Sequence, residues 1–157
     1  MNADLVSLDD VDRRILNALQ LDASQTNSEL AQQVHVSAPT CLRRVKHLVD
    51  TGVIEKRVAI LAPERIDARL TAIIEITLDI QAAERMDAFE AAVAGDDAVL
   101  QCYRVSPGPD FVLIAQVPDM PAYHALAHRL FAAQTNVRNV KTYFSTFRSK
   151  FETRIAV

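Results

Sequence analysis

Hydrophobic and polar positions follow two different periods along the chain, and the period changes near residue 70. Up to about residue 62, apolar residues recur every three or four positions, which is typical of amphipathic helices. Over residues 70–80, apolar and polar residues alternate one by one, which is typical of a strand with one buried face. This change predicts a helical domain over residues 1–62, a linker over residues 63–69 and a second domain over residues 70–157.

Three helices are predicted in the first domain. The residues suited to cap them are Asp9 or Asp10 for the first helix, Thr26 with Glu29 for the second, and Ser37 for the third. Gly52 supplies a left-handed stop after the third helix, because glycine adopts positive φ angles without steric cost. The predicted buried positions are Val11, Ile15, Ala18 and Leu19, then Leu30, Ala31 and Val34, and then Leu42, Val45, Leu48 and Val49.

A tight turn joins the second helix to the third, whose exposed face is basic, so the pair has a helix-turn-helix pattern. Residues 53–54 and 57–61 flank Glu55-Lys56 and predict a short two-stranded wing. Residues 1–35 carry two basic and six acidic side chains, whereas residues 36–57 carry five basic and two acidic ones. A basic helix and wing within a chain of net charge −3 predict contact with double-stranded DNA.

The third helix carries the side chains expected to contact DNA. Thr40 and Arg43 lie near its N-terminal end, which reaches base edges when such a helix enters the major groove. Neighbouring basic residues suit phosphates, which orient a protein without reading sequence. The basic run taken alone is equally compatible with an ordinary solvated helix face. The predicted DNA-contacting residues are Ser37, Pro39, Thr40, Arg43, Arg44, Lys46, His47, Lys56 and Arg57.

The second domain has the predicted order strand, helix, strand, strand, helix, strand. Its elements are expected over residues 70–80, 82–94, 99–105, 110–117, 119–131 and 138–147. This order is the ferredoxin-like βαββαβ arrangement, so the chain as a whole has an α+β fold. Helices cover such a sheet on one side only, and burial of the open face in a second copy predicts homodimerisation. The candidates for that face are Ile73, Tyr103, Val112, Ile114 and Phe147.

Composition narrows the possible function classes. The chain is 50% hydrophobic and 24% charged, which is typical of a globular protein. Its 3 glycines form neither a dinucleotide-binding fingerprint nor a P-loop. The apolar runs are too short for a membrane span and no secretory signal is visible, which predicts a cytoplasmic protein. Cys41 and Cys102 lack the spacing of a zinc site and are predicted to be buried thiols.

The sequence offers no catalytic residue and no metal site, and it predicts no cofactor. His124 and His128 have the i, i+4 spacing of one helix face, but no glutamate lies between them as in the H-E-x-x-H motif. They are therefore interpreted as solvated surface residues. Ser106 and the other serines lie outside any G-x-S-x-G context, which argues against a nucleophile elbow.

Several short motifs resemble those of one known family. In the first domain they are Leu8-Asp9-x-x-Asp12-Arg13-x-Ile15-Leu16, Leu30-Ala31, Ser37-x-Pro39-Thr40-Cys41-Leu42-x-Arg44-Val45 and Gly52-Val-Ile54. In the second domain they are Glu75-Ile-Thr-Leu78, Val105-Ser106, Asp110-Phe111, Val117-Pro-Asp-Met120 and Thr142-Tyr143. Together with the order of elements, they resemble the Lrp/AsnC (leucine-responsive, feast-famine) transcriptional regulators over nearly the whole chain.

The resemblance implies both an architecture and a function. It implies an N-terminal winged helix-turn-helix followed by a ferredoxin-like effector-binding and oligomerisation domain of the RAM or ACT-like type. It also implies dimers that join into larger rings, commonly octamers. An effector, an amino acid or a related small metabolite, is then expected between dimers, near the turn that joins the two middle strands.

The expected effector turn departs from the family pattern. Family members usually have glycine directly after Val-Ser/Thr, whereas here two prolines flank a displaced glycine and stiffen the loop. Asp110 keeps its position, and it is either a partner for an effector's ammonium group or a turn residue bonded to its own backbone. The predicted effector-binding residues are Ser106, Pro107, Gly108, Pro109, Asp110, Gln134, Thr135 and Asn136.

Two other functions fit the same architecture. Sirohaem decarboxylase subunits resemble this family, so an enzyme of tetrapyrrole chemistry is one alternative. A module that binds an amino acid without binding DNA is the other. The basic third helix favours the transcriptional regulator, and a colourless preparation that shifts duplex DNA would separate it from the enzyme.

Overall fold

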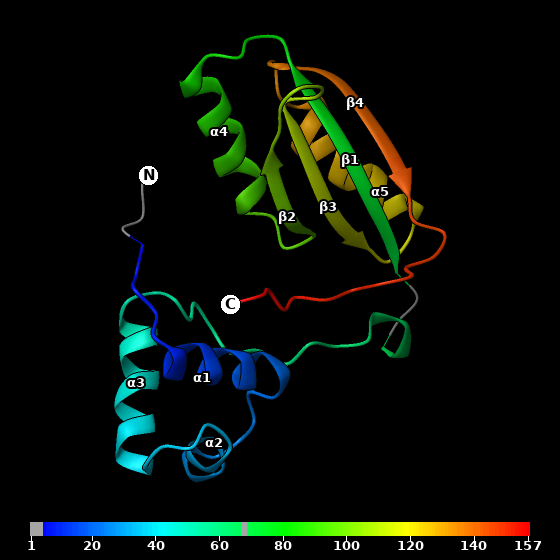
Figure 1. Ribbon diagram of the computed structural model, residues 1–157. Coiled ribbons are helices and arrows are strands. Elements are labelled where there is room, and N and C mark those ends of the chain that lie inside the picture. Colours follow the sequence, from blue (N-terminus) through cyan, green and yellow to red (C-terminus); the bar gives the residue numbers. More distant parts are fainter. Residues whose placement is uncertain (1–4, 67–68) are drawn as a thin grey trace. The chain divides into compact units, whose positions relative to one another are not determined.

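The computed structural model describes residues 5–66 and 69–157, and it divides into two compact units (Figure 1). The first unit holds the chain up to Ile60 together with Lys150–Val157, and the second holds Leu61–Ser149. The sequence pattern assigns residues 70–157 entirely to the second domain, so the structure differs by adding 150–157 to the helical unit. Residues 67–68 of the predicted linker lie outside the described residues.

The first unit contains the three predicted helices, α1 (Asp10–Leu21), α2 (Asn27–Gln33) and α3 (Ala38–Asp50). Asp9, Thr26 and Ser37 are their N-caps, because each side chain accepts a hydrogen bond from a free amide of the first turn. Gly52 adopts a φ of 74°, which confirms the left-handed stop after α3. The helices enclose a core of Ile15, Leu16, Ala18, Leu30, Ala31, Val34, Cys41 and Leu48.

The buried stripe of α3 differs from the prediction at two of its four positions. Leu42 and Val49 were expected inside this unit, but they are 60% and 46% exposed. Leu48 is fully buried and Val45 packs against the core, as predicted, and Cys41, predicted as a buried thiol, is also fully buried. The inward residues Cys41, Val45 and Leu48 recur at intervals of four and three, so Leu42 and Val49, each one position further round the helix, face outward.

The predicted two-stranded wing is wrong, because residues 53–62, all described, form no strand pair. Val53 and Ile54 pack against the core of the first unit, and the Ile54 amide donates to the Leu48 carbonyl at 2.9 Å. The chain then continues without regular structure. Glu55-Lys56 offers none of the Gly, Asn or Asp residues that a two-residue hairpin turn favours, so nothing in the sequence closes the hairpin.

The second unit is a four-stranded antiparallel sheet with two helices in the predicted βαββαβ order. Its elements are β1 (Leu70–Leu78), α4 (Ala83–Ala94), β2 (Val99–Arg104), β3 (Phe111–Val117), α5 (Met120–Ala127) and β4 (Val137–Phe144). A π-helical turn, His128–Ala132, extends α5, and a short 3₁₀ turn, Pro63–Arg65, precedes β1. The strands lie in the order β2-β3-β1-β4, so β1 and β3 are central. The predicted ferredoxin-like fold is confirmed.

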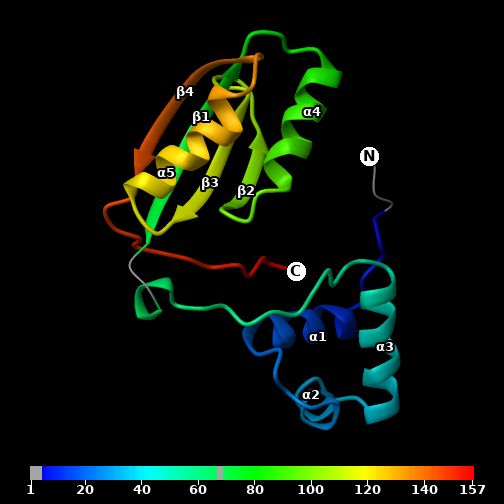
Figure 2. The same cartoon turned by 180° about the vertical axis from the view of Figure 1, so that it is seen from behind.

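Helices cover one face of the sheet and leave the other open, and Figure 2 shows α5 in front of the strands. Alternate side chains of β1 and β3, such as Ile74, Ile76 and Leu113, are buried beneath the helices. Phe89 of α4 stacks against Phe111 of β3 with ring centroids 4.8 Å apart. This burial of about half of each central strand holds the second unit together.

The open face carries four of the five residues predicted for it. The strand register pairs Ile73 with Ile114 and Tyr103 with Val112, on the side away from the helices. Phe147 is the exception, because β4 ends at Phe144 and leaves Phe147 beyond the sheet, 83% exposed. The strand stops early because its partner β1 begins at residue 70, and few partner residues remain beyond that point.

Candidate functional site

The basic side chains of α3 lie on its exposed face. Arg43, Lys46 and His47 are all exposed and are three or four positions apart, so they share one side of the helix. Cys41 and Leu48 on the other side are fully buried in the first unit. The structure therefore brings these three predicted residues together on one solvent face.

Local hydrogen bonds fix the N-terminal end of α3. The Thr40 amide donates to Ser37 Oγ at 3.4 Å, and the two hydroxyl groups are 2.8 Å apart. Asn27 at the start of α2 donates from Nδ2 to the Ala38 carbonyl at 2.9 Å. Pro39 stands in the first turn, where its missing N–H has no intrahelical partner to lose. The entry of α3 is thus tied to the start of α2.

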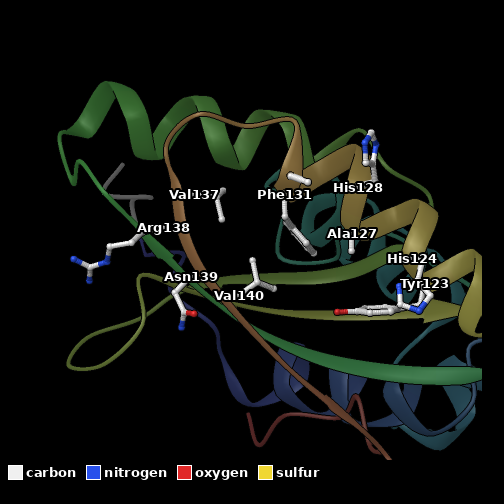
Figure 3. Close-up of a pocket in the computed structure, with 10 residues that line it drawn as sticks. Tyr123, His124, Ala127, His128, Phe131, Val137, Arg138, Asn139 and Val140 are labelled. Carbon is white, nitrogen blue, oxygen red and sulfur yellow. The ribbon is translucent and has the colours of Figure 1, made fainter.

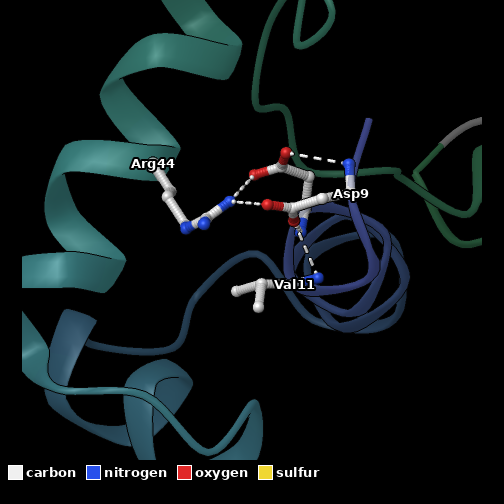
Figure 4. A network of polar contacts seen from close by, with 4 residues as sticks. Asp9, Val11 and Arg44 are labelled. Carbon is white, nitrogen blue, oxygen red and sulfur yellow. Dashed lines mark hydrogen bonds and ion pairs between the residues drawn. The ribbon is translucent and has the colours of Figure 1, made fainter. Parts of the chain in front are cut away.

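Arg44 is the exception among the predicted α3 residues, because its side chain points to α1 (Figure 4). Its Nη1 donates to Asp9 Oδ2 at 2.7 Å and to Asp12 Oδ1 at 2.8 Å. The two aspartates also form the capping box of α1, in which each carboxylate accepts the backbone amide of the other residue. Arg44 therefore ties the middle of α3 to the first turn of α1.

This network favours the charged forms of Arg44 and Asp9. Hydrogen bonds to Asp12 and then to Asp9 raise the pKa of the Arg44 guanidinium. The backbone amide of Asp12, followed by Arg44, lowers the pKa of the Asp9 carboxyl. A shallow pocket of about 460 Å³ lies beside the network, lined by Asp12, Arg43, Arg44 and His47.

Lys56 and Arg57, the remaining predicted DNA contacts, lie after α3. Both are exposed on the segment for which the sequence predicts a wing. Because this segment forms no strand pair, their side chains are not held in register with each other. Their positive charges are exposed to solvent. No regular structure in this segment orients the two side chains.

Asp110 is buried and bonded to the central strand β1. Its backbone amide donates to the Ile76 carbonyl at 2.8 Å, and the Leu78 amide donates to Asp110 Oδ2 at 2.7 Å. The residue is only 7% exposed. The carboxylate therefore bonds to a backbone amide of β1 and not to the residue's own turn, and its role toward an effector's ammonium group stays a prediction.

Asn136 bonds in the same way to Ile80, two residues after the Leu78 amide that Asp110 accepts. The Ile80 amide donates to Asn136 Oδ1 at 3.0 Å, and Asn136 Nδ2 donates to the Ile80 carbonyl at 3.1 Å. Its own carbonyl accepts the Asp79 amide at 2.9 Å. The two predicted effector loops, 106–110 and 134–136, therefore meet on residues 76–80. In the first loop Ser106, Pro107 and Gly108 are exposed, and Gly108 adopts a φ of 124°.

A second hollow lies between α5 with its π-helical turn and the first half of β4, and it contains none of the predicted effector residues. It is a shallow pocket of about 490 Å³. Figure 3 shows Phe131, Val137 and Val140 around the hollow, whereas the Arg138 side chain points away from it. Periodicity correctly predicts that Phe131 is buried. No sequence signal predicts the π-helical turn His128–Ala132, which forms one side of this pocket.

The two thiols differ in burial from His124 and His128, the pair spaced four residues apart. Cys41 is fully buried and Cys102 half-buried, and burial raises the pKa of both thiols. His124 and His128 are exposed, as predicted. Within residues 5–66 and 69–157, no group of three or more His, Cys, Asp or Glu side chains is placed to hold a metal ion. None of the described helices is long and apolar enough to cross a membrane.

Comparison with protein families gives a match for each unit. Residues 8–55 match a winged helix-turn-helix DNA-binding domain, and residues 71–155 match the Lrp/AsnC ligand binding domain. The chain belongs to the Lrp/AsnC family. It is a DNA-binding transcriptional regulator with a separate ligand-binding domain.

Relatives in the Lrp/AsnC family match nearly the whole chain. The leucine-responsive regulatory protein of Salmonella typhimurium is 36% identical over 150 residues, which span 96% of this chain and 92% of the relative. The structure of an AsnC family regulator from Agrobacterium tumefaciens is 32% identical with a TM-score of 0.86, covering 94% and 96% of the two chains. A Neisseria meningitidis transcriptional regulator, solved as a complex with L-Met, is 30% identical with a TM-score of 0.86, covering 95% and 96%.

The end of the matched ligand-binding sequence differs from the end of the second unit in the structure. The matched ligand-binding sequence extends to residue 155, yet residues 150–157 belong to the helical unit in space. In this Lrp/AsnC protein, a segment from the sequence of one domain is therefore part of the fold of the other.

Proposed function

We propose that this Lrp/AsnC regulator reads double-stranded DNA with the N-terminal end of α3. The observation that carries the proposal is the exposed face of Arg43, Lys46 and His47 on a helix whose opposite face is buried. A helix held in this way inserts its first turns into the major groove. The residues assigned to bases are Thr40 and Arg43, those assigned to phosphates are Lys46, His47, Lys56 and Arg57, and Ser37 and Pro39 form the first turn and cap of the helix.

Fluorescence anisotropy on an operator selected from random duplexes tests this assignment. Arg43→Ala is expected to lose roughly 1–3 kcal/mol on the operator and little on a scrambled duplex, because it removes a base contact. Lys56→Ala is expected to weaken both duplexes alike and to reduce the salt slope by about 1, because it removes a phosphate contact. Arg85→Ala on the exposed surface of α4 is the control. Wild-type binding by both variants at every salt concentration would contradict the proposal.

We also propose that a small effector, an amino acid or a related metabolite, binds near the end of β1 between dimers. Both predicted loops are attached there, through Asp110 and Asn136. The L-Met complex of the Neisseria relative supports an amino acid as the ligand class. The Asp110 carboxylate is the group assigned to an ammonium, since a carboxylate forms strong hydrogen bonds to a cation.

A thermal-shift screen against the twenty amino acids, beginning with L-Met, tests the effector proposal. A ligand at 100-fold its dissociation constant stabilises the protein by about 2.7 kcal/mol. Asp110→Asn keeps an acceptor for the Leu78 amide but removes the charge, so we expect a near-normal melting temperature and loss of the ligand shift. A full ligand shift in this variant would remove Asp110 from the site.

We propose further that the protein is a cytoplasmic homodimer that assembles into a higher oligomer such as an octamer. The support is an open sheet face with Ile73, Tyr103, Val112 and Ile114, on the side that the two helices of the second unit leave uncovered. A monodisperse monomer in sedimentation at micromolar concentration would contradict it. The relatives are transcriptional regulators, and we propose that this chain likewise acts by binding and not by catalysis.

A further inference from the structure

Segment 150–157 follows the second unit along the chain but folds with the first. The chain therefore passes between the two units twice, once after Ile60 and again after Ser149. With the connection after Ile60 alone, the DNA-binding unit would be joined to the second unit by a single chain segment. The second passage adds a restraint for as long as segment 150–157 stays docked on the first unit.

One glutamine of α1 makes the central contact with this segment. Gln20 Nε2 donates to the Ile155 carbonyl at 3.0 Å, and the Ile155 amide donates to Gln20 Oε1 at 2.8 Å. A single side-chain amide thus satisfies both main-chain groups of one residue, as a neighbouring strand does in a sheet. Asn17, one helical turn earlier on α1, donates from Nδ2 to the Val157 carbonyl at 3.4 Å.

Two apolar side chains of the segment differ in burial, and the one that packs on the first unit is called the anchor below. Val157 packs against the core of the first unit, whereas Ile155 is 68% exposed. Recognition therefore relies on main-chain groups, together with one apolar side chain two positions after the bonded residue. An exposed surface built in this way fits an extended peptide, and segment 150–157 is the peptide that occupies it.

We propose that Asn17 and Gln20 form a docking site for segment 150–157, and that the docked segment limits the reach of the DNA-binding unit. The hydrogen bonds from Asn17 and Gln20 to the segment are solvent-exposed, so docking is reversible at low cost compared with unfolding of either unit. Undocking leaves only the connection that follows Ile60, and the loss of the second restraint relaxes the distances at which two DNA-binding units engage DNA together. This consequence rests on the DNA-binding function proposed above, whereas the docking itself does not.

Hydrogen-exchange mass spectrometry of the full chain tests the docking. The Ile155 amide is expected to exchange slowly in the wild type and about tenfold faster in Gln20→Ala, since two modest hydrogen bonds contribute about that factor. Gln33→Ala, an exposed glutamine of α2, is the matched control and leaves Ile155 unchanged. Val157→Ser, which removes the anchor and retains the bonded residues, accelerates exchange as well. Exchange at Ile155 that is already at the unprotected rate in the wild type, or unaltered in both variants, overturns the proposal.

Binding to paired half-sites tests the limit on reach. Two copies of the selected half-site are moved apart in steps of one base pair up to about half a helical turn. We expect the wild type to lose affinity at displaced spacings more steeply than Gln20→Ala, with equal affinity of both for a single half-site. Identical spacing profiles overturn the proposal. If neither protein binds the selected DNA, the proposed DNA-binding function fails, while exchange at Ile155 still decides the docking.

Discussion

Arg44 directs its charge inward, to the first turn of α1. Its Nη1 is bonded to both Asp9 and Asp12, and Asp12 is only 8% exposed. Surface ion pairs contribute little on their own, but removing one partner from a buried carboxylate leaves a charge without compensation. We therefore infer that Arg44 positions α3 against α1 and does not neutralise a phosphate.

Arg44→Ala separates positioning from contact with DNA. We expect weaker binding to operator DNA with an unchanged slope of log affinity against log salt, because no phosphate contact is lost. The free energy of unfolding is expected to fall by about 1–3 kcal/mol, since the Asp12 carboxylate loses its cation. Salt titrations by anisotropy and urea unfolding measure the two effects. A slope reduced as in Lys56→Ala would show that Arg44 contacts phosphate after all.

The lowered pKa of Asp9 makes this network sensitive to acid. The Asp12 backbone amide and Arg44 hold the pKa of Asp9 below that of the unfolded chain. The stabilisation is therefore fully present above the unfolded pKa and is lost as the pH falls through the folded one. We expect the difference in unfolding free energy between wild type and Asp9→Asn to shrink from about pH 6 to about pH 2.5. Asp10→Asn, outside the network, is the control, and a constant difference for Asp9→Asn would contradict the linkage.

The turn between α2 and α3 contains an unusual backbone conformation. His35 adopts a φ of 58°, in the left-handed region that favours glycine. This conformation reverses the chain before the cap of α3. Its conformational free-energy cost lowers the stability of the DNA-binding unit.

His35→Gly is expected to stabilise the protein. Relief of the left-handed strain contributes about 1–2 kcal/mol, and the greater freedom of glycine in the unfolded chain offsets roughly 0.5–1 kcal/mol of it. The net gain of about 0.5–1 kcal/mol is measured by urea unfolding. His35→Ala, which retains the strain, serves for comparison. A loss of stability in the glycine variant would show that the imidazole compensates for its backbone.

The elements that sequence predicts well are those with local signals. Thr26 and Ser37 identify helix starts because a cap bonds to amides within three residues. Leu42 fails because its exposure depends on where α1 and α2 pack against α3. For the same reason, the sequence predicts the exposed face of α3 but misses the role of Arg44, whose partners lie 32 and 35 residues away.

The effector loops illustrate the same limit at longer range. Their residues were predicted from the family resemblance, and no periodic pattern indicates that they share a strand end. Asp110 and Asn136 meet on residues 76–80 only because β1 pairs with β3 on one side and with β4 on the other. Sheet order, which the single sequence does not encode locally, therefore brings these two loops together.

At the scale of the whole molecule, the open sheet face of the second unit carries apolar side chains that its helices do not cover. Its residues Ile73 and Ile114 lie opposite each other on the two central strands. Sheets with one uncovered apolar face generally bury it against another layer. A second copy of the same sheet supplies such a layer without any further protein.

Ile114→Glu tests assembly through this face. A carboxylate placed there has to be desolvated on association, so sedimentation velocity is expected to show a shift from dimers or larger species to monomers. Ala88→Glu on the exposed surface of α4 adds the same charge and is expected to leave the assembly unchanged. Equal sedimentation of wild type and Ile114→Glu would exclude this face from the interface.

The position of β4 at the edge of the sheet has a consequence for solubility. An edge strand presents free main-chain groups to which a strand of another molecule can add. β4 carries exposed Arg138 and Lys141, and Lys141 Nζ lies 4.9 Å from the centre of the Tyr143 ring. Two copies that met along this edge would bring like charges together. Growth into an extended intermolecular sheet is thereby opposed, and copies of the chain can stack their open faces without aggregating through their edges.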